Sequence, residues 1–251
     1  MHTTFVGIDP TSGNRPVTYA ALDSNLHLLS LGMEDFNEVM AFVAGLPQAL
    51  VAVSAPQRPN QGLMDSSEVR QRLSPQPRPG RWTNFRLAEY QMRQHRISCP
   101  RTASREKDCP GWMQMGFTLY RRLEGLGFKP YPEESLFQWI EVYPHAAFCA
   151  LLGQRPFPKT TLEGRIQRQL VLYEENLNIP DPMRFFEEIT RHRLLTGTLP
   201  YDDIYGPRQL DAVVSAYTAW LTGNYPGRVT FLGDEHEGQV VLPVPELKQR
   251  Y

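Results

Sequence analysis

Three acidic residues lie where an ionised carboxylate is costly to bury. Asp9 ends a short apolar run, Glu141 is enclosed by tryptophan, isoleucine and valine, and Asp211 is the only charged residue of the largely apolar segment 209–224. Burying a carboxylate is unfavourable unless a positive charge meets it, and clustered carboxylates raise one another's pKa values. If these three side chains converge, their oxygens favour Mg²⁺ or Mn²⁺ as the neutralising cation.

A divalent ion held by these acids would support hydrolysis of a phosphodiester bond, because it activates a water molecule and stabilises the leaving oxygen. The alternative for Asp211 is structural, since a carboxylate near the start of a helix interacts favourably with the helix dipole. Asp211 alone does not distinguish these two roles. The choice between them depends on whether the strands and helices that carry the three acids bring them together.

Apolar runs and turn residues predict one α/β domain that spans residues 1–251. Strand patterns lie at 5–9, 17–22, 26–31, 49–55 and 137–143, and a C-terminal hairpin is expected from 229–232 and 240–242. Helix patterns lie at 36–43, 85–94, 113–126, 146–152, 162–175, 183–195 and 209–224. The first three strands form an antiparallel meander, and the helix after them carries the chain to a parallel fourth strand. The expected core is therefore a mixed five-stranded sheet flanked by helices.

Residues 58–135 are predicted to form a basic helical insertion within this domain. Between Arg58 and Arg122 there are 13 Lys or Arg residues and 5 Asp or Glu, although the whole chain has a net charge of −1. Aromatic residues alternate with these arginines, and nucleic-acid grooves combine cations for phosphates with aromatic faces for bases. The candidate nucleic-acid-binding residues are Arg81, Trp82, Arg86, Arg93 and Arg96. A solvated insertion with a small core of its own is the alternative.

Composition and length are typical of a globular protein of the reducing cytoplasm. The 251-residue chain is 41% hydrophobic and contains no apolar run long enough to cross a bilayer, so we expect no membrane association. The first ten residues follow a strand pattern and not that of a signal peptide. Three cysteines are too few, and odd in number, for a disulfide framework, which favours a cytoplasmic location.

Several short motifs, taken in order, resemble those of one family. They are Gly7-Ile8-Asp9, Glu141-Val142-Tyr143-Pro144, Leu210-Asp211-Ala212 and Gly233-Asp234. The family is an uncharacterised-domain group described as predicted nucleases with the ribonuclease-H-like fold, and the resemblance covers nearly the whole chain. It implies that Asp9, Glu141 and Asp211 are the catalytic, metal-binding acids of a nuclease that uses Mg²⁺ or Mn²⁺ and acts on DNA or RNA.

One position departs from the family pattern. The family commonly has an aspartate before the Ala-Pro that ends its fourth strand, where this chain has Ser54. A hydroxyl removes one negative charge and one good ligand, so the site either works with weaker metal binding or binds nucleic acid without cutting it. Other residues expected near the pocket are His145, Lys159 and Arg165, with a turn or a solvated helix face as the alternative for each.

A second enzyme class fits the first loop of the chain. The segment 7–13 also resembles the first phosphate loop of actin-like sugar kinases, which would make the protein a phosphotransferase. Such kinases close a second comparable domain over ATP, and the sequence offers no second glycine-rich phosphate loop. A metal-dependent nuclease is therefore the favoured function, with a non-catalytic nucleic-acid-binding module and an actin-like phosphotransferase as alternatives.

Overall fold

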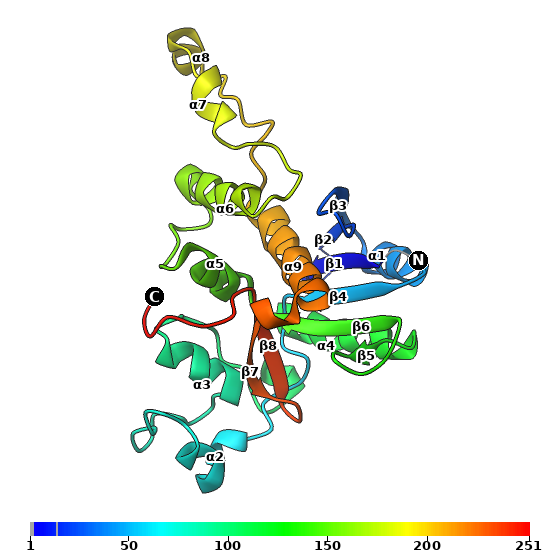
Figure 1. Ribbon diagram of the computed structural model, residues 1–251, viewed down its shortest axis with the longest axis vertical. Helices are drawn as coiled ribbons and strands as arrows, with labels where there is room; N and C mark the ends of the chain where they lie inside the picture. Colours follow the sequence, from blue (N-terminus) through cyan, green and yellow to red (C-terminus); the bar gives the residue numbers. More distant parts are fainter. Residues whose placement is uncertain (1–2, 14) are drawn as a thin grey trace.

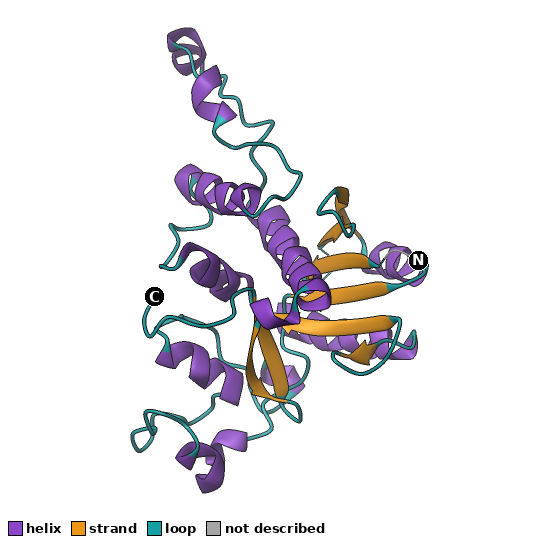
Figure 2. Ribbon diagram, viewed as in Figure 1, coloured by secondary structure: helices purple, strands orange, loops and turns teal. Residues whose placement is uncertain are grey.

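A mixed β-sheet runs through the computed structural model, which describes residues 3–13 and 15–251 (Figures 1 and 2). Its strands are β1 (Thr4–Asp9), β2 (Val17–Leu22), β3 (Leu28–Glu34), β4 (Ala49–Val53), β5 (Lys129–Pro130), β6 (Phe137–Val142), β7 (Thr230–Asp234) and β8 (Gly238–Leu242). The order is β3-β2-β1-β4-β6-β8-β7, with β5 also paired to β6. Pairing is antiparallel within β1–β3 and within the β7–β8 hairpin, and parallel along β1, β4, β6 and β8.

The α/β architecture with a mixed sheet flanked by helices is confirmed, but the predicted number of five strands is wrong. Within the described residues the sheet has eight strands, because the two strands of the C-terminal hairpin and the short β5 join the five that were predicted. Strand β8 pairs with the end of β6, where Val240 lies opposite Glu141 and Val241 lies opposite Val142. Both valines are buried, so this pairing removes apolar surface from water.

Helices cover both faces of the sheet (Figure 2). They are α1 (Phe36–Ala44), α2 (Ser67–Gln71), α3 (Leu87–Gln94), α4 (Gly111–Gly125), α5 (Pro144–Leu152), α6 (Leu162–Glu174), α7 (Arg184–Glu188), α8 (Arg191–Thr196) and α9 (Pro207–Asn224). The single helix predicted at 183–195 is wrong. Two short helices form there because the Thr190 hydroxyl accepts a hydrogen bond from the amide of Arg193 and begins α8 as a new helix.

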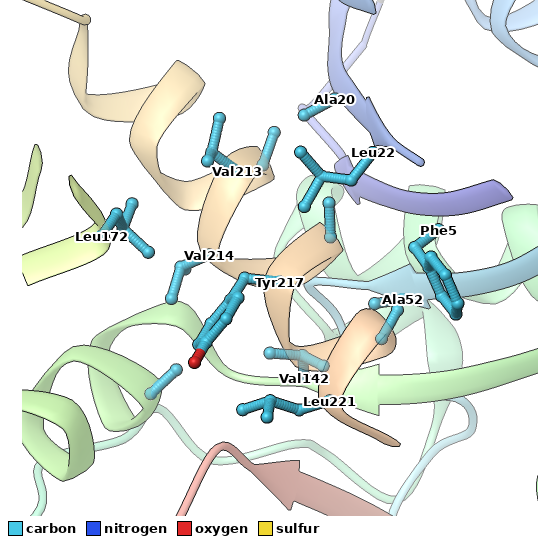
Figure 3. Close-up of a cluster of buried hydrophobic side chains, with 14 of the residues drawn as sticks. Phe5, Ala20, Leu22, Ala52, Val142, Leu172, Val213, Val214, Tyr217 and Leu221 are labelled. Carbon is cyan, nitrogen blue, oxygen red and sulfur yellow. The ribbon is translucent and has the colours of Figure 1, made fainter. Parts of the chain in front are cut away.

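Helix α9 packs across one face of the sheet and forms the largest core. Figure 3 shows Tyr217 and Leu221 of this helix beside Val142 of β6, with Phe5 and Ala52 contributed by β1 and β4. Alanines on the remaining sides of α9 are fully buried as well. The helix is therefore enclosed on several sides, as its low charge predicts.

Helices α1 and α4 cover the opposite face. Val39 and Val43 of α1 and Leu119 and Leu123 of α4 belong to a second core cluster with Val51 of β4. Helix α4 and the short β5 both lie within the segment that the sequence marks as an insertion, and both pack on the central sheet. Among the described residues, none of the helices combines the length and apolar character that a bilayer crossing requires.

Candidate active site

A pocket of about 860 Å³ opens where β1 ends and α9 begins. Its charged lining consists of two acids, Asp9 and Asp211, and four cations, Arg155, Lys159, Arg168 and Arg208. This volume lies within the range of ordinary small-molecule and cofactor sites. The pocket therefore combines two carboxylates with a surplus of positive charge.

Gly7 allows α9 to approach β1 closely enough to bring the two acids together. Gly7 and Asp9 lie on the same face of β1, because side chains alternate along a strand. A Cβ atom at Gly7 would overlap the carbonyl oxygen of Ala212 and the amide nitrogen of Ala216. Since Ala212 directly follows Asp211, this close contact places Asp211 at the strand end that carries Asp9.

Both carboxyl groups hold their protons more tightly than they would in water. Burial, followed by repulsion from Asp211, raises the pKa of Asp9 to about 7, although Lys159 and Arg208 act in the opposite direction. Burial also raises the pKa of Asp211, even though Lys159 Nζ donates a hydrogen bond to its Oδ2 at 2.6 Å. In both groups, burial therefore outweighs the attraction of the surrounding cations.

Three of the four cations were not predicted. Arg208 stands three residues before Asp211 on α9, and this spacing puts both side chains on one side of the helix, so the sequence did contain that signal. Arg155, in the loop after α5, and Arg168, on α6, have no such local signal. They reach the pocket because of how the loop and helix fold back towards α9.

The guanidinium group of Arg168 is held in place by main-chain oxygens. Its Nη1 donates to the carbonyl groups of Phe157 and Gly164, both at 2.8 Å, and the side chain is buried. A cation that is already fixed in position loses little conformational entropy when an anion binds, so the entropic cost of binding is smaller. Arg168 therefore lines the pocket with a guanidinium group whose position is fixed by the protein.

Ser54 lines the same pocket from the end of β4. Its amide donates to the carbonyl oxygen of Ile8 at 2.9 Å, which places it beside Asp9. Its Oγ lies 2.8 Å from the Oγ of Ser215, which in turn bonds to the carbonyl oxygen of Asp211 at 2.8 Å. The hydroxyl thus links β4 to the first turns of α9 and supplies no charge.

His145, near the start of α5, also lines the pocket. Burial lowers its pKa to about 4, and the positive charges of Arg168, Arg155 and Lys159 act in the same direction. The imidazole is therefore neutral near pH 7. An imidazole with so low a pKa is a weak base, and it adds no positive charge to the pocket.

Glu141 does not line the pocket with the other two acids. Ile8, Val53 and Glu141 are in register across β1, β4 and β6, so they share one face of the sheet. Asp9 is one residue further along β1, and successive strand residues point to opposite faces. The expected cluster of three carboxylates is therefore corrected to the pair of Asp9 and Asp211.

Glu141 instead forms a buried ion pair with Arg86. The two nitrogen–oxygen distances are 2.7 and 2.9 Å, and the side chains are 1% and 4% exposed. Arg86 also donates to the carbonyl oxygen of Glu237 at 3.0 Å, and the amide of Gln57 donates to Glu141 at 3.0 Å. The expectation that Arg86 contacts nucleic acid is wrong, because this guanidinium is inaccessible and bound to protein groups.

Arg165 does not line the pocket either. Its Nε donates to the carbonyl oxygen of Tyr205 at 2.8 Å, and its Nη2 donates to that of Ile204 at 2.6 Å. Arg165 therefore secures the loop that leads into α9. Arg168, one turn further along α6, lines the pocket in its place.

The other candidate residues of the basic segment lie at different exposed sites. Arg81 and Arg93 line a second, smaller pocket, whereas Arg96 is exposed just after α3. Trp82 is half-buried, with the guanidinium of Arg70 4.4 Å from the centre of its ring. These residues do not contribute to the lining of the pocket around Asp9.

The donors around Asp9 and Asp211 fit one divalent cation. Mg²⁺ commonly binds proteins through one or two carboxylates and fills its remaining positions with water or phosphate oxygens. Within residues 3–13 and 15–251, no cluster of three or more His, Cys, Asp or Glu side chains is arranged to hold a metal ion. Asp9 and Asp211 supply two carboxylates, the ligand type that Mg²⁺ prefers, to the lining of the pocket.

Residues 7–237 match the family described as "Protein of unknown function (DUF429)". The matched range includes the acids of the pocket, Ser54 and the Glu141–Arg86 pair, and it confirms the resemblance to an uncharacterised-domain family. No curated protein and no solved structure matches the chain.

Proposed function

The chain belongs to the DUF429 family of unknown function, and we propose that it is a Mg²⁺- or Mn²⁺-dependent nuclease that hydrolyses phosphodiester bonds of DNA or RNA. The observation that carries this proposal is the pair of Asp9 and Asp211 in a pocket whose other charged residues are all cations. A phosphodiester is an anion, so four cations favour its entry. The raised carboxyl pKa values favour a further positive charge beside the pair.

The strand arrangement supports a ribonuclease-H-like assignment. The run β3-β2-β1-β4-β6 consists of three antiparallel strands followed by parallel ones, as the family resemblance implies. Asp9 lies at the end of the central strand of this run. In open α/β sheets, ligands bind at the carboxyl ends of parallel strands, where the direction of chain connection changes.

The cations of the pocket bind the substrate. Arg155, Arg168 and Arg208 bind phosphate oxygens, and Lys159 keeps Asp211 ionised through their 2.6 Å contact. The partial burial of the pocket strengthens each of these attractions relative to bulk water. Substrate therefore binds with its phosphate directed towards the two acids.

The reaction requires a base for the attacking water. Asp9 and Asp211 would hold the cation, which would lower the pKa of a water molecule and offset charge on the phosphate. The proton of the attacking water passes to solvent as the new phosphorus–oxygen bond forms, because His145, whose pKa burial lowers to about 4, is too weak a base to hold it. The bond to the leaving oxygen then breaks, and that oxygen takes a proton from solvent.

A cleavage assay tests the proposal. Labelled oligonucleotides are incubated with Mg²⁺ or Mn²⁺ and the wild-type protein, and we expect cleavage that Asp9→Asn and Asp211→Asn each reduce by at least about 10²-fold. Glu163→Gln is the matched control, because Glu163 is exposed on α6 and outside the pocket. Nucleic-acid binding without any cleavage would replace the nuclease by the non-catalytic binding module.

A further inference from the structure

A second pocket, of about 360 Å³, lies on the basic segment around the start of α3. It is lined by three arginines, Arg81, Arg93 and Arg101, and by the aromatic residues Phe85 and Tyr90, among others. Its lining contains no acidic residue. A concentration of positive charge without a carboxylate is suited to an anion.

Two of these arginines are held in position before any ligand arrives. The guanidinium groups of Arg93 and Arg101 lie 4.7 and 4.3 Å from the centre of the buried Phe85 ring. Arg93 also donates to the carbonyl oxygen of Cys99 at 2.9 Å. Cation–π contacts fix each guanidinium but leave its charge uncompensated, so the pair remains available to phosphate oxygens.

An aromatic ring accompanies this charge. Tyr90 is half-buried, lies 6.3 Å from Phe85 between ring centres in an edge-on arrangement, and lines the pocket. Proteins that bind single strands combine cations along the backbone with aromatic rings on which bases stack. The second pocket contains both components.

The two pockets lie on either side of one short stretch of chain. Ser98 and Pro100 line the pocket around Asp9, and the next residue, Arg101, lines the second pocket. Consecutive Cα atoms are only about 3.8 Å apart. The linings of the two pockets are therefore only one residue apart along the chain at Pro100 and Arg101.

We propose that the second pocket binds a phosphate and base adjacent to the scissile bond, and that the substrate is a single strand. The inference rests on the proposed nuclease function, because it assigns the neighbouring nucleotide of the same substrate. The strand must bend around Pro100 to occupy both pockets. Duplex DNA, with a persistence length of about 150 base pairs, resists such a local turn, whereas a single strand follows it readily.

Binding measured without divalent metal separates this inference from catalysis. Fluorescence anisotropy in EDTA reports affinity for a labelled oligothymidylate and for a duplex of equal length, over a series of salt concentrations. We expect Arg93→Gln and Arg101→Gln each to weaken single-strand binding roughly tenfold, the effect of losing one hydrogen bond to a charged group. Each should also reduce the slope of log affinity against log salt by about 0.7.

Arg191→Gln is the control, because it removes the same charge from the exposed helix α8. This helix lies at one end of the molecule, whereas α2 and α3 lie towards the other end (Figure 1). Equal losses in all three variants, or equal affinity of the wild type for duplex and single strand, would overturn the inference.

Cleavage in Mn²⁺ provides a second measurement. The value of kcat/KM for the oligonucleotide is divided by that for a dinucleotide, and we expect this ratio to be lower in Arg101→Gln than in the wild type. If the wild type cuts neither substrate but the binding losses occur, the nuclease proposal fails and the strand-binding site stands.

Discussion

The Asp9 carboxyl group retains its proton up to about pH 7 because it is removed from bulk water and faces Asp211. Lys159 and Arg208 moderate this shift without abolishing it. A carboxyl group that ionises near neutral pH responds to any cation placed beside it, because cation binding and proton release are linked. Metal binding by this protein should therefore depend on pH.

Thermal melts over about pH 5 to 8 measure this linkage. The folded protein retains the Asp9 proton between pH 3.8 and about 7 while the unfolded chain has lost it, so stability falls as pH rises through this window. Glu89, whose pKa burial raises from 4.5 to about 7, acts in the same direction. Asp9→Asn should make the pH dependence shallower and remove an increase in Tm with Mn²⁺ that grows towards pH 8. An unchanged pH profile in this variant would contradict the assigned pKa shift.

Ser54→Asp tests whether position 54 limits metal affinity. The new carboxylate would lie beside Asp9 and would lose the 2.8 Å contact with Ser215, so the metal-free protein should melt at a lower temperature. Mn²⁺ should restore the melting temperature and bind more tightly than to the wild type, because one ligand has been added. Ser54→Asn is the uncharged control. Equal Mn²⁺ affinity in the wild type and Ser54→Asp would show that residue 54 does not reach the cation.

At the scale of elements, the contact between β1 and α9 determines the geometry of the pocket. The backbone of α9 passes over Gly7, and this contact sets how far the first turns of the helix lie from the strand. Asp211 belongs to those turns, so the separation of the two acids depends on a residue that has no side chain. The close packing of α9 on β1 therefore explains why a glycine stands at position 7 of the Gly7-Ile8-Asp9 motif.

Gly7→Ala should destabilise the protein by about 1–3 kcal/mol or more, because a methyl group would overlap the backbone of α9. It should also weaken Mn²⁺ binding, since α9 has to move away from Asp9. Gly45→Ala is the matched control. A Cβ there would lie at an ordinary 3.5 Å from the nearest atoms, so its effect should stay within about 1 kcal/mol. Equal losses in denaturant titrations of the two variants would contradict this role of Gly7.

The Arg86–Glu141 pair joins the start of α3 to β6. Arg86→Met should destabilise the protein by about 3–5 kcal/mol, because it leaves Glu141 buried without its counter-ion. Arg121→Met breaks a comparable two-nitrogen pair with Glu106, but that pair is exposed, so the expected loss is below about 1 kcal/mol. Denaturant titration compares the two variants. Losses of similar size would show that the buried pair is not a structural link.

The sequence was sufficient to predict most elements, but not the short β5, the division of 183–195 into α7 and α8, or the contacts between distant elements. Apolar runs located β1 and β4, and the low charge of 209–224 predicted an enclosed helix. Glu141 was placed in the correct strand, but the face of the sheet on which it lies depends on the pairing of β6 with β4. Apolar residues flank Glu141 on both sides, so the sequence shows no alternation of polar and apolar residues that would predict that face. Arg86 resembles the other arginines of its segment because its partner, Glu141, is 55 residues away. Long-range pairing of this kind leaves no local pattern.

Across the whole molecule, basic residues from different parts of the chain line the two pockets. The span from Arg58 to Arg122 holds 13 of the 26 basic residues, and it supplies the arginines of the second pocket. The cations around Asp9 come from Arg155 to Arg208, outside that span. Both pockets are lined by more cations than acids, although the net charge of the chain is −1.

Anomalous diffraction from crystals soaked in Mn²⁺ tests the central claim most directly. We expect a peak between the carboxylates of Asp9 and Asp211, with oxygen atoms at roughly 2.1 Å from the ion, and no peak there in Asp9→Asn. Lys159 should then release Asp211, because the ion takes over its charge. A wild-type crystal soaked above pH 7 that shows no peak at this pair, or one only at other acids, would contradict the assignment of this pocket as a metal-dependent active site.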